Sequence, residues 1–169
     1  MKKAILATTI CAILLGCAAH ADPSAGEGSH PMVVFDRAAF NRARSAWEAQ
    51  GITSYTFEML DAPWDPWLRI TVMGGEVVRL EEVGAEKYGN VLYRWSGLMG
   101  IRGTVPLMFE WIEGRYRALL ANLEPSSAYR FYIIVRYNAD YHFPERFGSA
   151  MEGEDGGGQT TLRNFQPLE

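Results

Sequence analysis

The chain has 169 residues, of which 48% are hydrophobic and 21% are charged, and its formal net charge is −4. This size and composition are typical of one globular domain with a hydrophobic core. The mildly acidic balance and the lack of a basic block exclude nucleic acid as an expected partner.

The first 16 residues are predicted to be a secretory signal peptide. Two lysines precede an uncharged apolar run over residues 4–15, which is well short of the roughly 20 residues of a membrane-spanning helix. Leu-Leu-Gly then precedes Cys17 and resembles the bacterial lipobox, in which the cysteine is acylated and becomes the first residue. Ala19-His20-Ala21 is a competing site, where cleavage after Ala21 would release a soluble periplasmic or secreted protein. We favour lipid attachment at Cys17, because it directly follows the apolar run.

An acylated Cys17 predicts a protein of the bacterial cell envelope with a membrane as its partner. Each buried methylene contributes about 0.8 kcal/mol, so two or more chains make detachment negligible. Ala18 stands where proteobacterial lipoproteins of the inner membrane carry aspartate, so this resemblance favours the outer membrane, facing the periplasm. Cleavage before Cys17 removes Cys11 and two lysines, which leaves a charge of −6, no free thiol and no disulfide. Residues 17–35 are predicted to be a flexible tether and residues 36–169 a single domain.

The domain is predicted to begin with a helix. Asp36 is a suitable amino-terminal cap and Gly51 a suitable terminator, with Phe40, Ala43 and Trp47 on one apolar stripe. Residues 53–60 and 67–73 then alternate between apolar and polar side chains, which predicts two strands. Their inward residues are expected to be Tyr55, Phe57, Met59, Leu68, Ile70 and Val72.

Gly74-Gly75 is predicted to turn the second strand into a return strand over residues 76–83. A two-residue loop would set Arg79 opposite Ile70. A three-residue loop sets Val78 opposite Ile70 and Leu80 opposite Leu68, which keeps apolar groups together. We therefore predict a three-residue turn with a glycine in the left-handed conformation and a bulge beside it.

The glycine-rich residues 84–103 lack a clean period and predict at most a short strand near residues 91–95. Thr104 then caps a predicted helix that has Pro106 in its first turn and ends near residue 124. Two shorter helices are the alternative, because Gly114 weakens the helix by about 1 kcal/mol relative to alanine. The apolar stripe of this helix is Met108, Ile112, Tyr116, Leu119 and Leu123.

Residues 128–144 contain the clearest strand pattern, and we expect the rest of the chain to pack around this central strand. One face carries apolar residues from Tyr129 to Tyr137, and the other alternates with them from Arg130 to Arg136. Residues 145–151 are predicted to pair back onto it, and residues 160–166 to form a last strand with Leu162. The fold class is therefore α+β, an antiparallel sheet with two main helices packed on one face.

Over residues 40–165 the chain resembles a bacterial family of secreted and lipid-anchored proteins, domain-of-unknown-function family 6174. The resemblance implies the fold and the compartment, and it implies no activity because the family has no established one. The chain departs from the family at Asn138, where aspartate is usual, at His142, where glycine is usual, and in lacking cysteines between residues 60 and 67. The motifs that carry the resemblance are Trp47 with Gly51-Ile52-Thr53-Ser54-Tyr55-Thr56-Phe57, Ile70-Thr71-Val72-Met73-Gly74-Gly75-Glu76-Val77-Val78, Thr104-Val105-Pro106-Leu107-Met108-Phe109, and Val135-Arg136-Tyr137-Asn138 running to Tyr141-His142-Phe143-Pro144.

The sequence offers no pattern for catalysis, a metal or a cofactor. His142 is the only histidine of the domain, and no serine motif or free thiol accompanies it, so we expect a turn residue packed on Tyr141. Glu152, Glu154 and Asp155, beside three glycines, lack the alternate spacing of a calcium loop and predict a solvated turn. Residues 84–89 have P-loop spacing but are followed by Asn90 instead of lysine.

The aromatic residues suggest an interaction surface. Trp64 and Trp67 flank Asp65-Pro66, while Tyr93 and Trp95 lie in the glycine-rich connection. Exposed together, these rings would form an apolar patch of the kind that marks an interface. The alternative is that they cover the sheet.

These observations favour a non-catalytic binding or interaction module whose partner is an envelope protein or a cell-wall component. A first alternative is an enzyme or enzyme accessory that uses residues 81–103, which requires Glu81, Glu86, Arg94 or His142 to converge in one pocket. A second alternative is an inhibitor of an extracytoplasmic enzyme that presents its loops.

Overall fold

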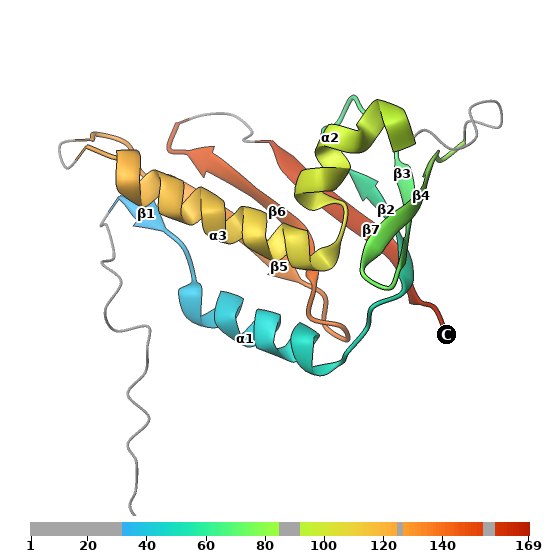
Figure 1. Cartoon of the computed structure of the whole chain (residues 1–169). Helices are drawn as coiled ribbons and strands as arrows, with labels where there is room; N and C mark the ends of the chain where they lie inside the picture. The colour runs from blue at the N-terminus through green and yellow to red at the C-terminus, as the bar shows by residue number, and fades with distance from the viewer. Residues whose placement is uncertain (1–31, 85–91, 125–126, 154–157) are drawn as a thin grey trace, which may run out of the picture.

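The computed structural model describes residues 32–84, 92–124, 127–153 and 158–169, and for residues 92–94 only the backbone (Figure 1). In these residues seven strands form one sheet in the order β1-β5-β6-β7-β2-β3-β4. β1 pairs with β5 in parallel, and every other pairing is antiparallel. The elements are β1 (Val33–Val34), α1 (Arg37–Ala49), β2 (Tyr55–Leu60), β3 (Leu68–Met73), β4 (Glu76–Glu82), α2 (Leu92–Arg102), α3 (Val105–Asn122), β5 (Phe131–Tyr137), β6 (Pro144–Met151) and β7 (Gln159–Pro167).

The helices cover one face of the sheet. Figure 1 shows α1 and α3 lying across this face, with α2 at one end, against α3 and β4. The α+β class with helices on one face is therefore confirmed, and the sheet differs from expectation in its parallel β1 pairing, in the position of β5 and in the β3–β4 register. The opposite face carries no helix in the described part of the chain, and we call it the open face.

The first helix forms as the sequence predicts. The Asp36 carboxylate accepts a hydrogen bond of 2.8 Å from the backbone N–H of Ala39, and Gly51 ends the turn with φ +64°. The predicted stripe of Phe40, Ala43 and Trp47 is buried. These local signals succeed because caps and helical periodicity depend on neighbours within a few residues.

The second predicted helix is one continuous helix, α3. The Thr104 hydroxyl accepts a hydrogen bond of 3.4 Å from the N–H of Leu107, and the helix runs through Gly114 without a break. The alternative of two shorter helices is therefore wrong. Burial of the stripe from Met108 to Leu119 outweighs the low helix propensity of one exposed glycine.

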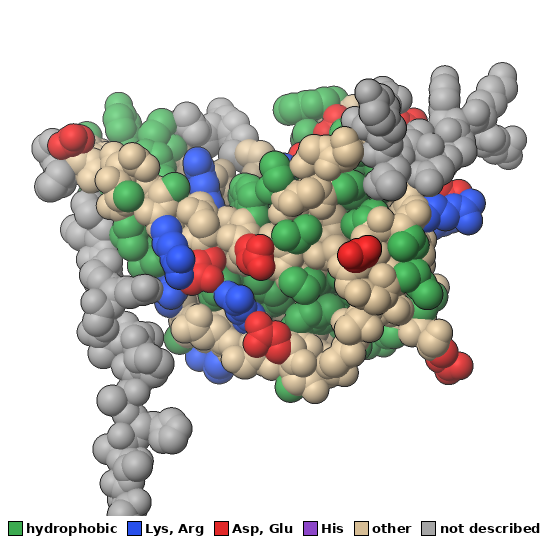
Figure 2. All heavy atoms as spheres, in the orientation of Figure 1, with side chains coloured by type: hydrophobic (Ala, Val, Ile, Leu, Met, Phe, Trp, Pro, Cys, Tyr) green, Lys and Arg blue, Asp and Glu red, His purple; other side chains and the backbone are tan. Residues whose placement is uncertain are grey.

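Charged residues join α1 to α3 on the helical side. The Glu113 carboxylate accepts hydrogen bonds of 2.9 Å from both Arg44 and Arg117, and the Arg37 guanidinium lies 3.6 Å from it. Figure 2 shows basic and acidic side chains mixed along these two helices. One carboxylate thus holds the two helices in register from the solvent side.

Aromatic packing fixes α1 on the sheet beneath it. The Trp47 ring contacts the rings of Tyr55 in β2, of Phe143 just before β6 and of Phe165 in β7, at centroid distances of 5.6, 6.3 and 5.8 Å. In each pair the two ring planes are nearly perpendicular. Edge-to-face pairs of this kind add about 0.5–1.5 kcal/mol each beyond area burial. All six inward residues predicted for β2 and β3 are buried here.

The β3–β4 hairpin corrects the predicted register. Gly74 and Gly75 have φ of +58° and +87°, as a two-residue type I′ loop requires, so the three-residue turn is wrong. The register shifts farther along, so that Leu80 rather than Val78 lies opposite Ile70, and Val78 is 48% exposed. A bulge that lies away from the turn, and not beside it as predicted, therefore brings two apolar residues opposite each other, although not the pairs that we predicted.

The predicted short strand near residues 91–95 is also wrong, because residues 92–102 form α2. Its core-facing residues Trp95, Leu98 and Met99 follow helical spacing, which the two glycines between and after them obscure. At its end, Arg102 binds Asp61 with hydrogen bonds of 2.6 and 3.2 Å and donates to the Thr160 hydroxyl at 2.9 Å. Tertiary contacts therefore stabilise a helix that local propensity does not predict.

The sheet is not centred on the strand that we expected. β5 lies beside the edge strand β1, and β7 occupies the middle position. The remaining predictions for this region are confirmed, since β6 pairs back onto β5 and β7 follows with Leu162 buried. Alternation identifies a strand with one buried face, but it carries no information about that strand's position in the sheet.

Candidate binding site on the open face of the sheet

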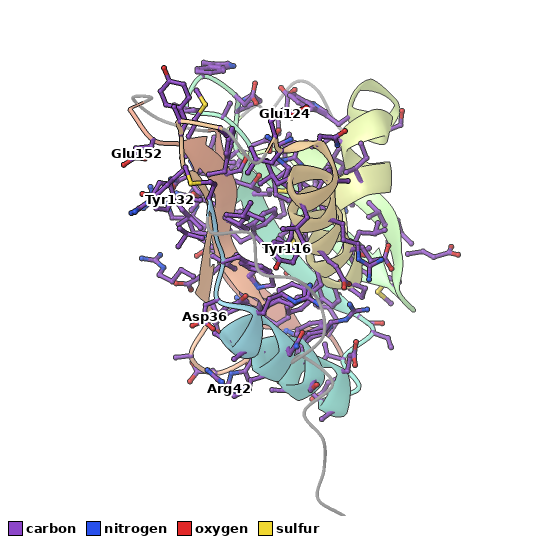
Figure 3. All side chains as sticks on the ribbon, turned by 90° about the vertical axis from the view of Figure 1, so that its left-hand side faces the viewer. Asp36, Arg42, Tyr116, Glu124, Tyr132 and Glu152 are labelled. Atoms are coloured by element: carbon purple, nitrogen blue, oxygen red, sulfur yellow. The ribbon has the colours of Figure 1, made fainter. Side chains whose placement is uncertain are left out.

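Polar side chains occupy the open face of the sheet, alternating with the core residues. In β5 the odd-numbered residues from Phe131 to Tyr137 pack against the core, so Tyr132, Ile134 and Arg136 face the other way. Figure 3 shows Tyr132 on the side away from α3 and Tyr116 on the helical side. By the same alternation the open face also carries Thr56, Glu58, Arg69, Thr71, Arg79, Glu81, Arg146, Thr161 and Arg163.

Glu58 differs from the other charged residues of this face because it is buried: it is only 3% exposed, although no described helix lies above it. Its Oε1 accepts a hydrogen bond of 2.8 Å from Nη2 of Arg69. Its Oε2 accepts from Nε of Arg163 at 2.8 Å and from Nδ2 of Asn164 at 2.9 Å. A buried charge is stable only when it is paired and hydrogen-bonded, and these three partners meet that requirement. We name Glu58, Arg69, Arg163 and Asn164 the Glu58 cluster.

Strand register places the members of the Glu58 cluster together. Arg69 of β3 and Arg163 of β7 lie directly opposite Glu58 on either side of β2. β7 carries one extra residue against β2 at this point, and Asn164 has φ +54°. This bulge lets two consecutive side chains reach the same carboxylate, and asparagine is among the residues that best tolerate the left-handed conformation.

Electrostatics keep Glu58 ionised. Burial acts to raise the pKa of its carboxyl group, but hydrogen bonds from Arg69, Arg163 and Asn164 outweigh it, and the pKa lies below the usual value of 4.5. The carboxylate therefore serves as a fixed anion that positions two guanidinium groups. The cluster as a whole carries one excess positive charge.

Trp67 holds the second arginine from the other side. The Cζ atom of Arg163 lies 3.7 Å from the centroid of the Trp67 ring, a close cation–π contact. Trp67 precedes β3, so the loop between β2 and β3 contributes to the site. Arg163 is thus fixed between a carboxylate and an indole.

A hollow of about 320 Å³ lies beside the cluster on the open face. Its size falls at the lower end of the range of small-molecule sites. Most of the side chains around it either donate hydrogen bonds or both donate and accept them. Its lining residues are Thr56, Phe57, Glu58, Arg69, Asn164 and Gln166.

The predicted aromatic residues have different surroundings. Trp64 is 85% exposed in the β2–β3 loop, and Trp67 contacts Arg163 as described. Trp95 lies on the helical side, packed against the core, and its Nε1 donates to Glu82 at 3.4 Å. Cys17 and the Tyr93 side chain lie outside the described part of the chain.

The ionisable residues considered for catalysis are separated where they are described. Glu81 accepts a hydrogen bond of 2.8 Å from Arg79 on the edge strand β4, whereas His142 lies in the β5–β6 turn, beyond three intervening strands. His142 has φ +61°, a left-handed conformation that glycine adopts more readily than other residues do. The Glu86 and Arg94 side chains lie outside the described residues.

Comparisons of the chain with protein-family models, with curated proteins and with solved structures gave no match. Within residues 32–84, 92–124, 127–153 and 158–169, no three or more histidine, cysteine or acidic side chains are grouped so as to hold a metal ion. Over the same segments, no helix has the length and apolar character needed to cross a membrane.

Sequence reasoning did not single out the Glu58 cluster. One signal was available, because Glu58 and Arg69 are opposite charges at facing positions of two consecutive strands. Arg163 and Asn164 gave no comparable signal, since they lie 105 and 106 residues farther along the chain. Only the pairing of β7 with β2 brings them to the carboxylate.

Proposed function

We propose that this chain is a non-catalytic binding module of the bacterial cell envelope, anchored to a membrane through Cys17. It binds its partner with the open face around the Glu58 cluster and with the β2–β3 loop beside it. The observation that carries the proposal is a buried carboxylate that fixes two arginines next to a hollow, on a sheet face that no described helix covers.

The anchor follows from the amino-terminal pattern of two lysines, an apolar run and Leu-Leu-Gly before Cys17. The stretch from Cys17 to Met32, where the described structure begins, spans at most about 50 Å when fully extended. The domain would therefore remain close to the membrane and sample partners in the adjacent envelope layer.

Binding suits the chemistry of the cluster better than proton transfer does. A general base works best with a pKa near the operating pH, whereas three hydrogen bonds hold the pKa of Glu58 below its usual value. The alternative of an enzyme needs Glu81, Glu86, Arg94 or His142 to converge in one pocket. Glu81 and His142, the two of these whose side chains are described, lie on different parts of the sheet. A fixed carboxylate that orients arginines supports recognition of a partner.

Intact mass and co-purification test this proposal together. We expect the mature chain, isolated from bacterial membranes, to start at an acylated Cys17 and to enrich a specific envelope component. A Trp64→Ala variant should lose that component, because Trp64 is 85% exposed beside the site and its removal leaves the core intact.

The matched control is Ile101→Ala, which removes a hydrophobic side chain that is 52% exposed on α2. This control should retain the component. An unmodified and uncleaved amino terminus would refute the anchor. Equal enrichment by wild type and Trp64→Ala would refute the binding surface.

A further inference from the structure

We infer that the hollow beside the Glu58 cluster binds an oxyanion, a carboxylate or a phosphate, carried on a sugar-sized polar unit. The inference rests on the proposed function and names the chemistry of its ligand. Arg69, which lines the hollow, is the residue that binds the anion, and Arg163 adds a second positive charge in the same cluster. Glu58 positions both arginines, and Trp67 positions Arg163.

The hydrogen-bond donors of the cluster exceed its internal acceptors. A guanidinium group carries five N–H donors, and in the described structure Arg69 uses one of them on Glu58 and Arg163 uses only its Nε. Asn164 has a second N–H, and Thr56 and Gln166 add polar groups to the lining. A donor-rich site of this kind suits a group that only accepts hydrogen bonds.

Charge complementarity points to a small anion. Two arginines against one carboxylate leave one excess positive charge in the Glu58 cluster, beside the hollow that Arg69 lines, in a chain whose formal net charge is −4. The local field attracts a single anionic group, whereas the acidic remainder of the molecule repels a long polyanion. The ligand is therefore a small unit with one acidic group.

The site is organised before any ligand arrives. Free arginine side chains lose rotamer freedom when they bind an anion, which weakens the interaction. Here Glu58 fixes Arg69, and Glu58 and the Trp67 ring together fix Arg163. The hollow of about 320 Å³ gives room for one sugar-sized unit on which the anionic group is carried.

A matched set of ligands tests the inference with the purified mature chain. N-acetylmuramic acid carries a carboxylate, N-acetylglucosamine 6-phosphate carries a phosphate, and N-acetylglucosamine is the neutral counterpart of both. We expect calorimetry to show at least one acid binding about tenfold or more tightly than the neutral sugar. The Nε–Hε signals of Arg69 and Arg163 should shift in NMR spectra with the same affinity. The stronger of the two acids identifies the source of the oxyanion.

Variants locate the binding. Arg69→Gln should weaken the acid by about tenfold to a hundredfold, since it removes a charge-assisted hydrogen bond. Arg136→Gln, on the same face but on β5 and paired with Glu145, is the control and should leave the affinity unchanged. Gln166 lines the hollow and is not one of the three hydrogen-bond partners of Glu58. Gln166→Ala should therefore weaken binding severalfold even if Arg69→Gln fails to fold.

The inference is overturned if the neutral sugar binds as tightly as both acids, if neither acid shifts the arginine signals, or if folded Arg69→Gln or Gln166→Ala keeps the wild-type affinity. An envelope component that depends on Trp64 but no binding of either acid would leave the proposed function standing and remove only its oxyanion chemistry.

Discussion

Replacing Glu58 with glutamine tests whether the buried carboxylate holds the open face together. The substitution keeps the size of the side chain but removes the charge, and it turns an amide NH₂ group toward one of the donors on Arg69, Arg163 or Asn164. A hydrogen bond to a charged group contributes about 1.5–3 kcal/mol. Both guanidinium groups are about half exposed, with side-chain exposures of 53% and 46%, so water screens part of the interaction.

We therefore expect Glu58→Gln to lower the free energy of unfolding by about 2 kcal/mol at neutral pH, measured by urea denaturation with tryptophan fluorescence. Glu81→Gln is the matched control. It removes a carboxylate from an exposed pair with Arg79 and should change stability by less than about 1 kcal/mol.

The pH dependence gives the sharper result. Because the folded-state pKa of Glu58 lies below the usual value of 4.5, its stabilising effect is fully present above that value and is lost as the pH falls through the folded-state pKa. The stability difference between wild type and Glu58→Gln should therefore shrink in acid. A variant as stable as wild type at neutral pH, or a difference that persists unchanged in strong acid, would refute this account of the cluster.

Three further predictions concern the packing that supports the site. Gly114→Ala should stabilise the protein by up to about 1 kcal/mol in thermal unfolding, because its new Cβ meets nothing within 4 Å. Gly103→Ala should destabilise it by about 1–3 kcal/mol, because its Cβ would lie 2.5 Å from the backbone oxygen of Met99. Arg102→Ala should reduce hydrogen-exchange protection across α2 more than across α3, since the lost ion pair joins α2 to the sheet; equal loss in both helices would contradict this. Tyr55→Phe should cost about 1–3 kcal/mol, because it leaves the buried N–H of Val105 without its acceptor at 2.9 Å. Burial raises the pKa of Tyr55 to about 12. The free energy of unfolding of the wild type, measured by urea denaturation, should therefore fall as the pH rises from 10.0 toward 12, and that of Tyr55→Phe should fall less.

Local patterns predicted those parts of the fold that depend on neighbours in sequence. Asp36, Gly51 and Thr104 marked helix ends correctly, and alternation assigned the inward residues of β2 and β3. α2 escaped prediction because its stability comes from contacts with α3, β4 and the Asp61 ion pair rather than from helix propensity.

The Glu58 cluster escaped prediction for a related reason. β7 reads as a strand with its two larger apolar groups, Leu162 and Phe165, three residues apart, and the bulge at Asn164 accounts for that spacing. The bulge can be placed only when β7 is known to pair with β2. The candidate site therefore depends on the one strand pairing that joins the most distant parts of the domain.

The short β1 strand also determines how the domain responds to tension on its amino-terminal segment. β1 is held to β5 by two residue pairs and by a hydrogen bond of 2.7 Å from the N–H of Phe131 to Met32. Detaching residues 32–34 from the sheet would let this segment extend by about 10 Å. The Phe35 ring packs against the rings of Phe40 and Tyr116 at centroid distances of 5.4 and 5.1 Å, so detaching residue 35 as well would also cost this aromatic packing. Tension on the amino-terminal segment would thus separate β1 from β5 before it disturbs the packing of α1 against the core.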